Sequence, residues 1–235
     1  MIRLHMIVEG QTEEAFANRV LVPHLAHFNV FADAQLLTSR LTRHSRRFKG
    51  GWNAYSALKK HLMQWNRMDG AEQAWFTTML DLYALPSDCP GFENVVSPEE
   101  PLARVLRLEE AFRLDAEMAG VRRLVPYLQL HEFEALILAD PQHLDWEFLE
   151  HDAQIRRITA MAGSFENPEM INSDPDTAPS KRIIAEIPEY EARKASAGPT
   201  VAERIGLNSL RVRCPHFHSW VSRIEQLDCD GHGSR

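Results

Sequence analysis

Residues 2–12 read IRLHMIVEGQT, an apolar run that ends on the carboxylate of Glu9 and is followed at once by Gly10. Apolar side chains fall on both faces of residues 2–8, which is typical of a β-strand that is covered on both sides. Thr12 is a candidate N-cap for a helix that begins directly after this strand. Ligands of open parallel sheets bind beyond the carboxyl ends of the strands, so this layout places Glu9 where such proteins carry their chemistry.

Further strand and helix signals alternate along the first 140 residues. Extended segments are predicted at residues 2–8, 30–38, 74–82 and 124–130. Helices are predicted to begin near Thr12 and to occupy residues 53–68, 101–118 and 131–139. This order predicts an α/β fold in which a parallel or mixed sheet is flanked by helices.

Beyond Pro141 the sequence changes character, because strand signals nearly vanish. Short helical stretches are separated there by Asn-Pro, Asp-Pro and Gly-Pro pairs, which favour breaks between helices. We therefore expect an α/β core at residues 1–140, a helical C-terminal subdomain at 141–229 packed on this core, and a tail at 230–235.

The composition narrows the class of protein. A formal net charge of −7 argues against nucleic-acid binding through the average field of the protein, so such binding needs a local basic patch. The three cysteines form no CxxC pair, which disfavours a disulfide framework or a four-cysteine zinc site. The sequence shows neither a cationic leader followed by a long apolar stretch nor a run long enough to span a membrane. We therefore expect a reduced, cytoplasmic protein.

Two carboxylates follow predicted strands, Glu9 after residues 2–8 and Asp81 near the end of residues 74–82. If these strands are neighbours, the two ionised side chains repel each other unless a cation lies between them. Mg²⁺ prefers oxygen ligands and often uses only one or two protein carboxylates, so the pair is a candidate metal site. The alternatives are structural: Glu9 caps the next helix or pairs with an arginine, and Asp81 begins a turn.

Three further acids, Asp88, Glu132 and Glu134, are candidate ligands for the same metal. Glu132 and Glu134 follow the predicted strand at 124–130 and could reach the same crevice. They equally suit the N-terminus of the helix at 131–139, where the helix dipole favours negative charge.

Residues 40–49 read RLTRHSRRFK and concentrate five fixed positive charges in an acidic protein. These cations are Arg40, Arg43, Arg46, Arg47 and Lys49. Such a loop suits the phosphate backbone of a nucleic acid, with an affinity that salt weakens. The alternative is a loop that binds an acidic protein partner or is only solvated. Lys181 and Arg182 follow a turn and would direct two cations at a phosphate from a helix N-terminus, or form a solvated surface pair.

Five stretches that span nearly the whole chain are VEGQTEEAF at 8–16, DLYALPSDCPG at 81–91, LQLHEFEALILAD at 128–140, INSDPDTAPSKRI at 171–183 and IGLNSLRVRCPHFHSW at 205–220. Together they resemble an uncharacterised bacterial family, the domain of unknown function 4276. This family is regarded as Toprim-like and is often linked to phage-defence loci beside an ATPase.

The resemblance implies a Toprim core, with a glutamate after the first strand and an Asp-x-Asp pair after a later strand. Carried over by position, Glu9 would be the general acid/base or a metal ligand, and Asp81 the first metal aspartate. Lys181 would be the cation that stabilises the transition state. Tyr83 stands in the second aspartate position and is a poor ligand for Mg²⁺, which weighs against a full two-metal site unless Asp88 reaches back from its loop.

These features together predict Mg²⁺- or Mn²⁺-dependent hydrolysis of phosphodiester bonds in nucleic acid, DNA or RNA. The resemblance implies an ATPase partner and a role in phage defence, and no membrane partner is expected. Two alternatives stay open. One is a non-catalytic Toprim-like module that binds the ATPase, and the other is a phosphoesterase that acts on a nucleotide-like small molecule.

Overall fold

The computed structural model describes residues 1–37, 54–92, 99–171 and 177–227. Within these residues the strands form one parallel sheet in the order β2-β1-β3-β4, with β5 paired to β3 further along. The strands are β1 (Ile2–Val8), β2 (Val30–Leu36), β3 (Ala74–Asp81), β4 (Leu124–Val125) and β5 (Leu128–Gln129). The predicted α/β class, with a parallel sheet flanked by helices, is confirmed.

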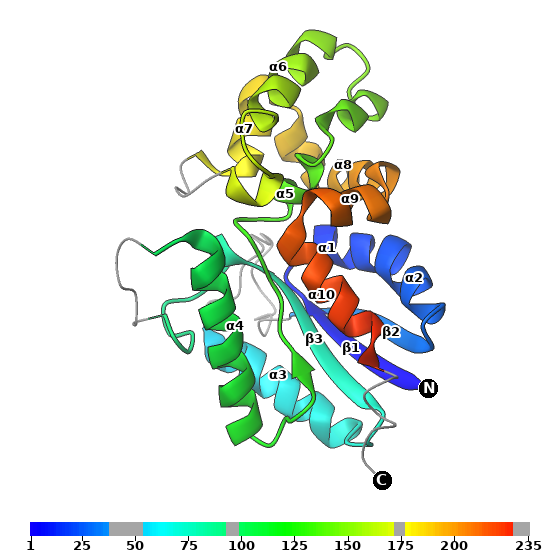
Figure 1. Cartoon of the computed structure of the whole chain (residues 1–235), viewed down its shortest axis with the longest axis vertical. Coiled ribbons are helices and arrows are strands. Elements are labelled where there is room, and N and C mark those ends of the chain that lie inside the picture. The colour runs from blue at the N-terminus through cyan, green and yellow to red at the C-terminus, as the bar shows by residue number, and fades with distance from the viewer. Residues whose placement is uncertain (38–53, 93–98, 172–176, 228–235) are drawn as a thin grey trace, which may run out of the picture.

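Helices cover both faces of the sheet, as Figure 1 shows. Ile7, Phe76 and Leu80 point into a core formed with α3 (Tyr55–Met68) and α4 (Pro101–Met118). Leu4 and Met6 point the other way, into a second core that includes residues of α1 (Gln11–Phe16), α2 (Val22–Ala26) and α10 (Pro215–Glu225). Because neighbouring residues of a strand face opposite sides, a sheet with two cores requires the continuous apolar strands seen in the sequence.

The last extended segment is divided at Pro126, which cannot donate a backbone hydrogen bond to a neighbouring strand. The hydroxyl of Thr78 bridges the break, because it accepts from the Tyr127 N–H and donates to the Tyr127 carbonyl, both at 2.9 Å. The strand predicted at 124–130 is therefore two short strands, β4 and β5, which both run parallel to β3.

The N-cap of the helix that leaves β1 lies two residues earlier than the proposed Thr12 cap. Gly10 is the N-cap residue and Thr12 lies inside the first turn, so that local prediction is wrong. The carboxylate of Glu13 reaches back and accepts a hydrogen bond from the N–H of the N-cap residue Gly10 at 2.9 Å, which is one half of a capping box. A π-helical turn at Ala17–Leu21 then connects α1 to α2.

The second half of the chain is helical. Its helices are α5 (Glu134–Ile137), α6 (Asp152–Ala162), α7 (Pro179–Glu186), α8 (Tyr190–Ile205), α9 (Leu207–Arg213) and α10. Figure 1 shows α5, α6 and α7 beyond the carboxyl end of the sheet, while α10 returns along the sheet. Trp220 of α10 stacks on Tyr127 with ring centroids 4.2 Å apart. No helix in the described ranges is both long and apolar enough to cross a membrane.

Candidate active site

Glu9 and Asp81 meet at the carboxyl edge of the sheet. Strands β1 and β3 are parallel neighbours with Val8 opposite Met79. Glu9 directly follows the end of β1, and Asp81, two residues beyond Met79, is the last residue of β3. The Glu9 carboxylate accepts a hydrogen bond from the Asp81 backbone N–H at 3.0 Å. The structure therefore brings together the two acids that the strand pattern singled out.

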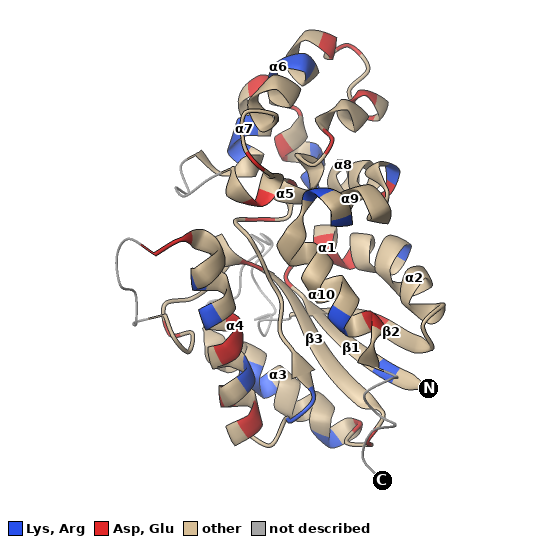
Figure 2. Ribbon diagram, viewed as in Figure 1, with Lys and Arg blue, Asp and Glu red and all other residues tan. Residues whose placement is uncertain are grey.

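Three more carboxylates join this pair, and we call Glu9, Glu13, Asp81, Glu132 and Glu134 the acidic cluster. Glu13 lies in the first turn of α1, and Glu132 and Glu134 lie around the start of α5. Figure 2 shows acidic residues where α1 and α5 begin, near the upper ends of the strands. Glu132 and Glu134 were predicted from the sequence as candidates and Glu13 was not, although Glu13 follows Glu9 by four residues across a tight strand-to-helix turn.

Lys194 supplies the positive charge that contacts this cluster. Its Nζ atom lies 3.1 Å from Glu134 Oε2 and 3.8 Å from Glu132 Oε2. Tyr190, four residues earlier on the same face of α8, donates its hydroxyl proton to Glu134 Oε1 at 2.9 Å. Lys194 was not predicted from the sequence, because no motif marks a lysine that reaches the site from a helix far along the chain.

Burial and mutual repulsion raise the pKa values of the central acids. The pKa of Asp81 lies well above its usual range, first because the carboxyl is buried and then because Glu9, Glu13 and Glu132 repel its charge. The pKa of Glu9 is raised chiefly by burial, although the Asp81 N–H and Lys194 lower it. One ammonium therefore does not balance this group of acids.

The outer acids are also hard to ionise. Burial raises the pKa of Glu13 to about 7, with a smaller contribution from the charge of Glu9. Burial likewise raises the pKa of Glu134 to about 7, against the opposing effect of Lys194. Near neutral pH, the acidic cluster therefore holds protons that ordinary surface glutamates would have lost.

One carboxylate oxygen of the acidic cluster is buried without a hydrogen bond from the described part of the chain. Asp81 Oδ1 is buried and has no hydrogen-bond partner among the described residues. A buried acceptor without a partner is costly, and a divalent cation would satisfy it while it neutralises the surrounding charge. The part of the chain described here contains no ready group of three metal-ligating side chains. Mg²⁺ needs only one or two carboxylates when substrate phosphate and water complete its shell, so the donor set fits Mg²⁺ or Mn²⁺.

Two other predicted residues lie outside the acidic cluster. Both carboxylate oxygens of Asp88 accept from the Tyr55 N–H, at 2.9 and 3.1 Å, at the N-terminus of α3. Lys181 is exposed on α7. The ammonium group that contacts the acidic cluster belongs instead to Lys194. The roles predicted for Asp88 and Lys181 stay predictions, and the geometry gives them no contact in the cluster.

The remaining phosphate-binding candidates are held differently. Arg182 donates from Nε to the Thr177 carbonyl at 2.8 Å and lies over the Phe165 ring. The neighbouring Ser180 N–H donates to Glu132, so the start of α7 is tied to the cluster. The five cations of the basic loop, Arg40, Arg43, Arg46, Arg47 and Lys49, lie outside the described residues.

Tyr83 and His131 form a second feature at the same edge. Tyr83 lies in a 3₁₀ turn at Leu82–Ala84, directly after β3, and His131 follows β5. The Tyr83 N–H donates to the His131 carbonyl at 3.1 Å, and the Tyr83 hydroxyl lies 2.9 Å from His131 Nδ1. Each residue is next to a member of the acidic cluster or two positions from one, so the pair borders the site.

The fold and the site define an α/β protein with an acidic cluster and one lysine at the carboxyl edge of a parallel sheet. The chain belongs to the family described as Domain of unknown function (DUF4276), whose model matches residues 8–225. The predicted family is therefore confirmed, and its Toprim-like character stays a prediction.

Two further comparisons add little about activity. The "C-terminal region of the Burkholderia pseudomallei OLD protein" is a structural relative at a TM-score of 0.43 and 13% identity, covering 96% of this chain and 98% of that chain. A likeness of this degree says nothing about what the chain does. A search of curated proteins finds no match.

Proposed function

We propose that this protein is a Mg²⁺- or Mn²⁺-dependent enzyme that hydrolyses phosphodiester bonds in nucleic acid. The observation that carries the proposal is the acidic cluster, in which Asp81 Oδ1 is buried beside the carboxylate of Glu9 with no hydrogen-bond partner in the described part of the chain. Perturbed, unsatisfied acids at the ligand-binding edge of a parallel sheet favour a functional role over a structural one.

Glu9 and Asp81 would hold the cation, with Glu132 as the third candidate ligand. The charges of Glu9 and Glu132 raise the pKa of Asp81, and the charge of Glu132 raises the pKa of Glu9, so a cation bound between these acids would relieve the repulsion. A bound divalent ion supplies charge neutralisation for the phosphate and for the oxygen atoms that gain negative charge during the reaction.

Lys194 would bind a non-bridging phosphate oxygen. Its ammonium is held at 3.1 Å by Glu134 and its side chain is 36% exposed, so it is both fixed and accessible. A positioned cation that faces a developing negative charge is a common source of transition-state stabilisation. We therefore assign to Lys194 the role that the sequence suggested for Lys181.

Contacts with the rest of the nucleic acid would come from the basic loop at 40–49, with Arg182 as a further candidate. Such contacts would be independent of base sequence and weakened by salt. An ATPase partner and a role in phage defence are further proposals, which the family resemblance supports.

The test is a cleavage assay with the full-length chain. Labelled single- and double-stranded DNA and RNA are incubated with Mg²⁺, Mn²⁺ or chelator, alone and with a candidate ATPase. Asp81→Asn, Glu9→Gln and Lys194→Gln are compared with Asp88→Asn, which changes a carboxylate outside the acidic cluster. We expect metal-dependent cleavage in the wild type and in Asp88→Asn, and at least about a 100-fold loss in the other variants.

Metal binding is measured separately by titration with Mn²⁺, because it does not require a substrate. Asp81→Asn should weaken Mn²⁺ binding and Asp88→Asn should not. Cleavage that survives both Asp81→Asn and Glu9→Gln would remove the site assignment. Mn²⁺ binding without cleavage of any nucleic acid, even with the ATPase, would instead favour a binding module.

A further inference from the structure

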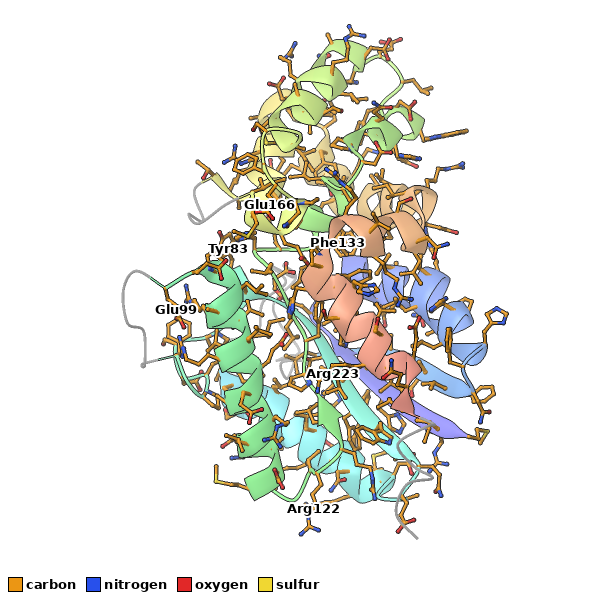
Figure 3. The ribbon with its side chains drawn as sticks, viewed as in Figure 1. Tyr83, Glu99, Arg122, Phe133, Glu166 and Arg223 are labelled. Carbon is orange, nitrogen blue, oxygen red and sulfur yellow. The ribbon has the colours of Figure 1, made fainter. Side chains whose placement is uncertain are left out.

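Tyr83 is the one tyrosine with an accessible ring. The chain contains four tyrosines, and Tyr55, Tyr127 and Tyr190 are all buried. Tyr83 is partly exposed, two residues after Asp81, and Figure 3 shows it at the end of the sheet that faces the upper helices. The phenol of Tyr83 therefore lies at the same edge of the sheet as the acidic cluster, where β3 ends.

His131 is held rigidly against this phenol. It is 1% exposed and has a φ of 67°, a left-handed conformation that is uncommon for a residue other than glycine. Such backbone strain persists only where surrounding contacts fix it, and it concentrates at functional sites. The backbone bond from the Tyr83 N–H to the His131 carbonyl, at 3.1 Å, is one such contact.

The hydrogen-bond partners of His131 decide the direction of its bond to Tyr83. Its Nε2 atom lies 2.9 Å from the carbonyl oxygen of Glu169, which can only accept, so Nε2 carries the proton. A buried imidazole favours its neutral form, in which the other nitrogen is an acceptor. The Tyr83 hydroxyl, 2.9 Å from His131 Nδ1, therefore donates its proton to that nitrogen.

This arrangement has the three parts of an activated nucleophile: a hydroxyl, a base within hydrogen-bond reach, and a third group that orients the base. We propose that Tyr83 attacks the phosphorus of the bound phosphodiester, so that the protein cleaves nucleic acid through a covalent phosphotyrosine. This inference rests on the proposed function and names the nucleophile of that reaction.

A bond forms between Tyr83 Oη and phosphorus, the bond from phosphorus to one ribose oxygen breaks, and the tyrosine proton passes to His131 Nδ1. The leaving ribose oxygen takes a proton from water. A water molecule then attacks the phosphorus and gives one proton to the hydroxide left by the first step. The bond from phosphorus to Tyr83 Oη breaks, the phosphate end is released, and the Tyr83 phenolate recovers its proton from His131. Attack by a strand hydroxyl in place of water would rejoin the strand, which gives the protein a second activity.

The stereochemical course at phosphorus tests this directly. A labelled oligonucleotide with one phosphorothioate of known configuration is cleaved by the wild type in H₂¹⁸O. A covalent intermediate inverts phosphorus twice and leaves net retention, whereas direct attack by water gives inversion. Retention supports the proposal and inversion overturns it, although inversion would leave metal-dependent hydrolysis intact.

Trapping the adduct gives a second, independent readout. Denaturant added early in the reaction should capture labelled nucleic acid on the protein, in the tryptic peptide 68–104, which contains Tyr83 as its only tyrosine. Tyr83→Phe should abolish both adduct and cleavage while it keeps Mn²⁺ binding and the thermal midpoint. His131→Gln, which can still accept a hydrogen bond but not a proton, should slow adduct formation at least about 100-fold. Cleavage by Tyr83→Phe at the wild-type rate would overturn the proposal, and a wild type that cleaves nothing would overturn it together with the proposed function.

Discussion

The two ends of strand β1 carry charged groups that are organised in opposite ways. Near its start, Arg3 binds Asp69 through two hydrogen bonds of 2.6 and 2.7 Å, and His5 lies between Asp69 and Asp33. Beyond its other end, the described residues give the acidic cluster around Glu9 one lysine and leave one buried oxygen without a hydrogen-bond partner. Each acid of the first group has a basic partner, whereas the second group has more acids than described cations.

The pKa directions follow this difference. The pKa of Asp69 is held well below its usual range, first by hydrogen bonds from Arg3 and then by those from His5. The pKa values of Glu9 and Asp81 are raised, chiefly by burial. The ionised carboxylate of Asp69 is thus stabilised by its partners at one end, whereas ionisation of Glu9 and Asp81 at the other end destabilises the folded protein. Destabilising groups of this kind are expected where a site serves function rather than folding.

Replacing Asp81 should have the largest effect and should change activity and stability in opposite directions. Asp81→Asn removes a candidate metal ligand and a buried, repelled charge at once. We expect at least about a 100-fold loss of metal-dependent cleavage, together with a free energy of unfolding raised by about 1–2 kcal/mol at pH 8. Cleavage rates and urea titrations of the same preparation measure both.

The matched change at the other end of β1 should do the reverse. Asp69→Asn should leave cleavage unchanged and lower stability, because Arg3 and His5 lose their partner. If Asp81→Asn also lowers stability at pH 8, the contrast between the two ends is wrong.

Replacing Lys194 should have the next largest effect, which is a loss of stability. Lys194→Met leaves Glu134, whose side chain is 0% exposed, without its positive partner. We expect a loss of about 1–3 kcal/mol, because breaking a buried pair costs more than the pair contributes and partial exposure of Lys194 reduces the effect. The double variant Lys194→Met/Glu134→Gln should recover most of this stability without recovering cleavage. Additive losses in this double-variant cycle would show that the two side chains act independently.

The pH dependence of stability should also distinguish the acidic cluster. Glu13 and Glu134 have pKa values raised from about 4.5 when exposed to about 7 in the folded protein. The folded state therefore binds more protons than the unfolded state between these values, so the free energy of unfolding falls as pH rises through this window. The limit is about 1.4 kcal/mol per pH unit for each group.

Urea unfolding between pH 5 and 8 measures this slope, and Glu13→Gln should flatten it. A bound divalent cation should oppose the loss, so Mg²⁺ should raise the thermal midpoint more at pH 8 than at pH 6. An equal effect of Mg²⁺ at both pH values would argue against metal binding to these acids.

The same contrast explains how far the sequence could predict the molecule. The helix predicted at 101–118 is observed as Pro101–Met118, because a proline begins it and Glu100 accepts from the Ala103 N–H at 3.0 Å. Glu9 and Asp81 were found for a similar local reason, since each follows an apolar strand and parallel strands end at one edge. Local signals therefore located both the frame and the two central acids.

Lys194 and Glu13 could not be found in this way. Lys194 is adjacent to Glu134 only because α8 packs over the start of α5 and against α1, a contact between distant parts of the chain. Glu13 resembles an ordinary acid in the first turn of a helix, and its raised pKa comes from burial that only the fold creates. Charge compensation and burial depend on tertiary packing, so sequence patterns do not report them.

The smallest expected effect belongs to the paired end of β1 and has the opposite sign in pH. The pKa of Asp69 is lowered in the folded protein from about 3.8, so its contribution to stability is present above this value and is lost as pH falls through the lower folded value. Asp69→Asn should therefore destabilise the protein by about 1 kcal/mol or less at pH 6, because the side chains are partly exposed, and the difference should shrink at pH 3. High salt should weaken it further. Urea midpoints at pH 3 and pH 6, at low and high salt, measure the effect. A difference that grows on acidification would show that Asp69 is repelled, as the acids of the acidic cluster are.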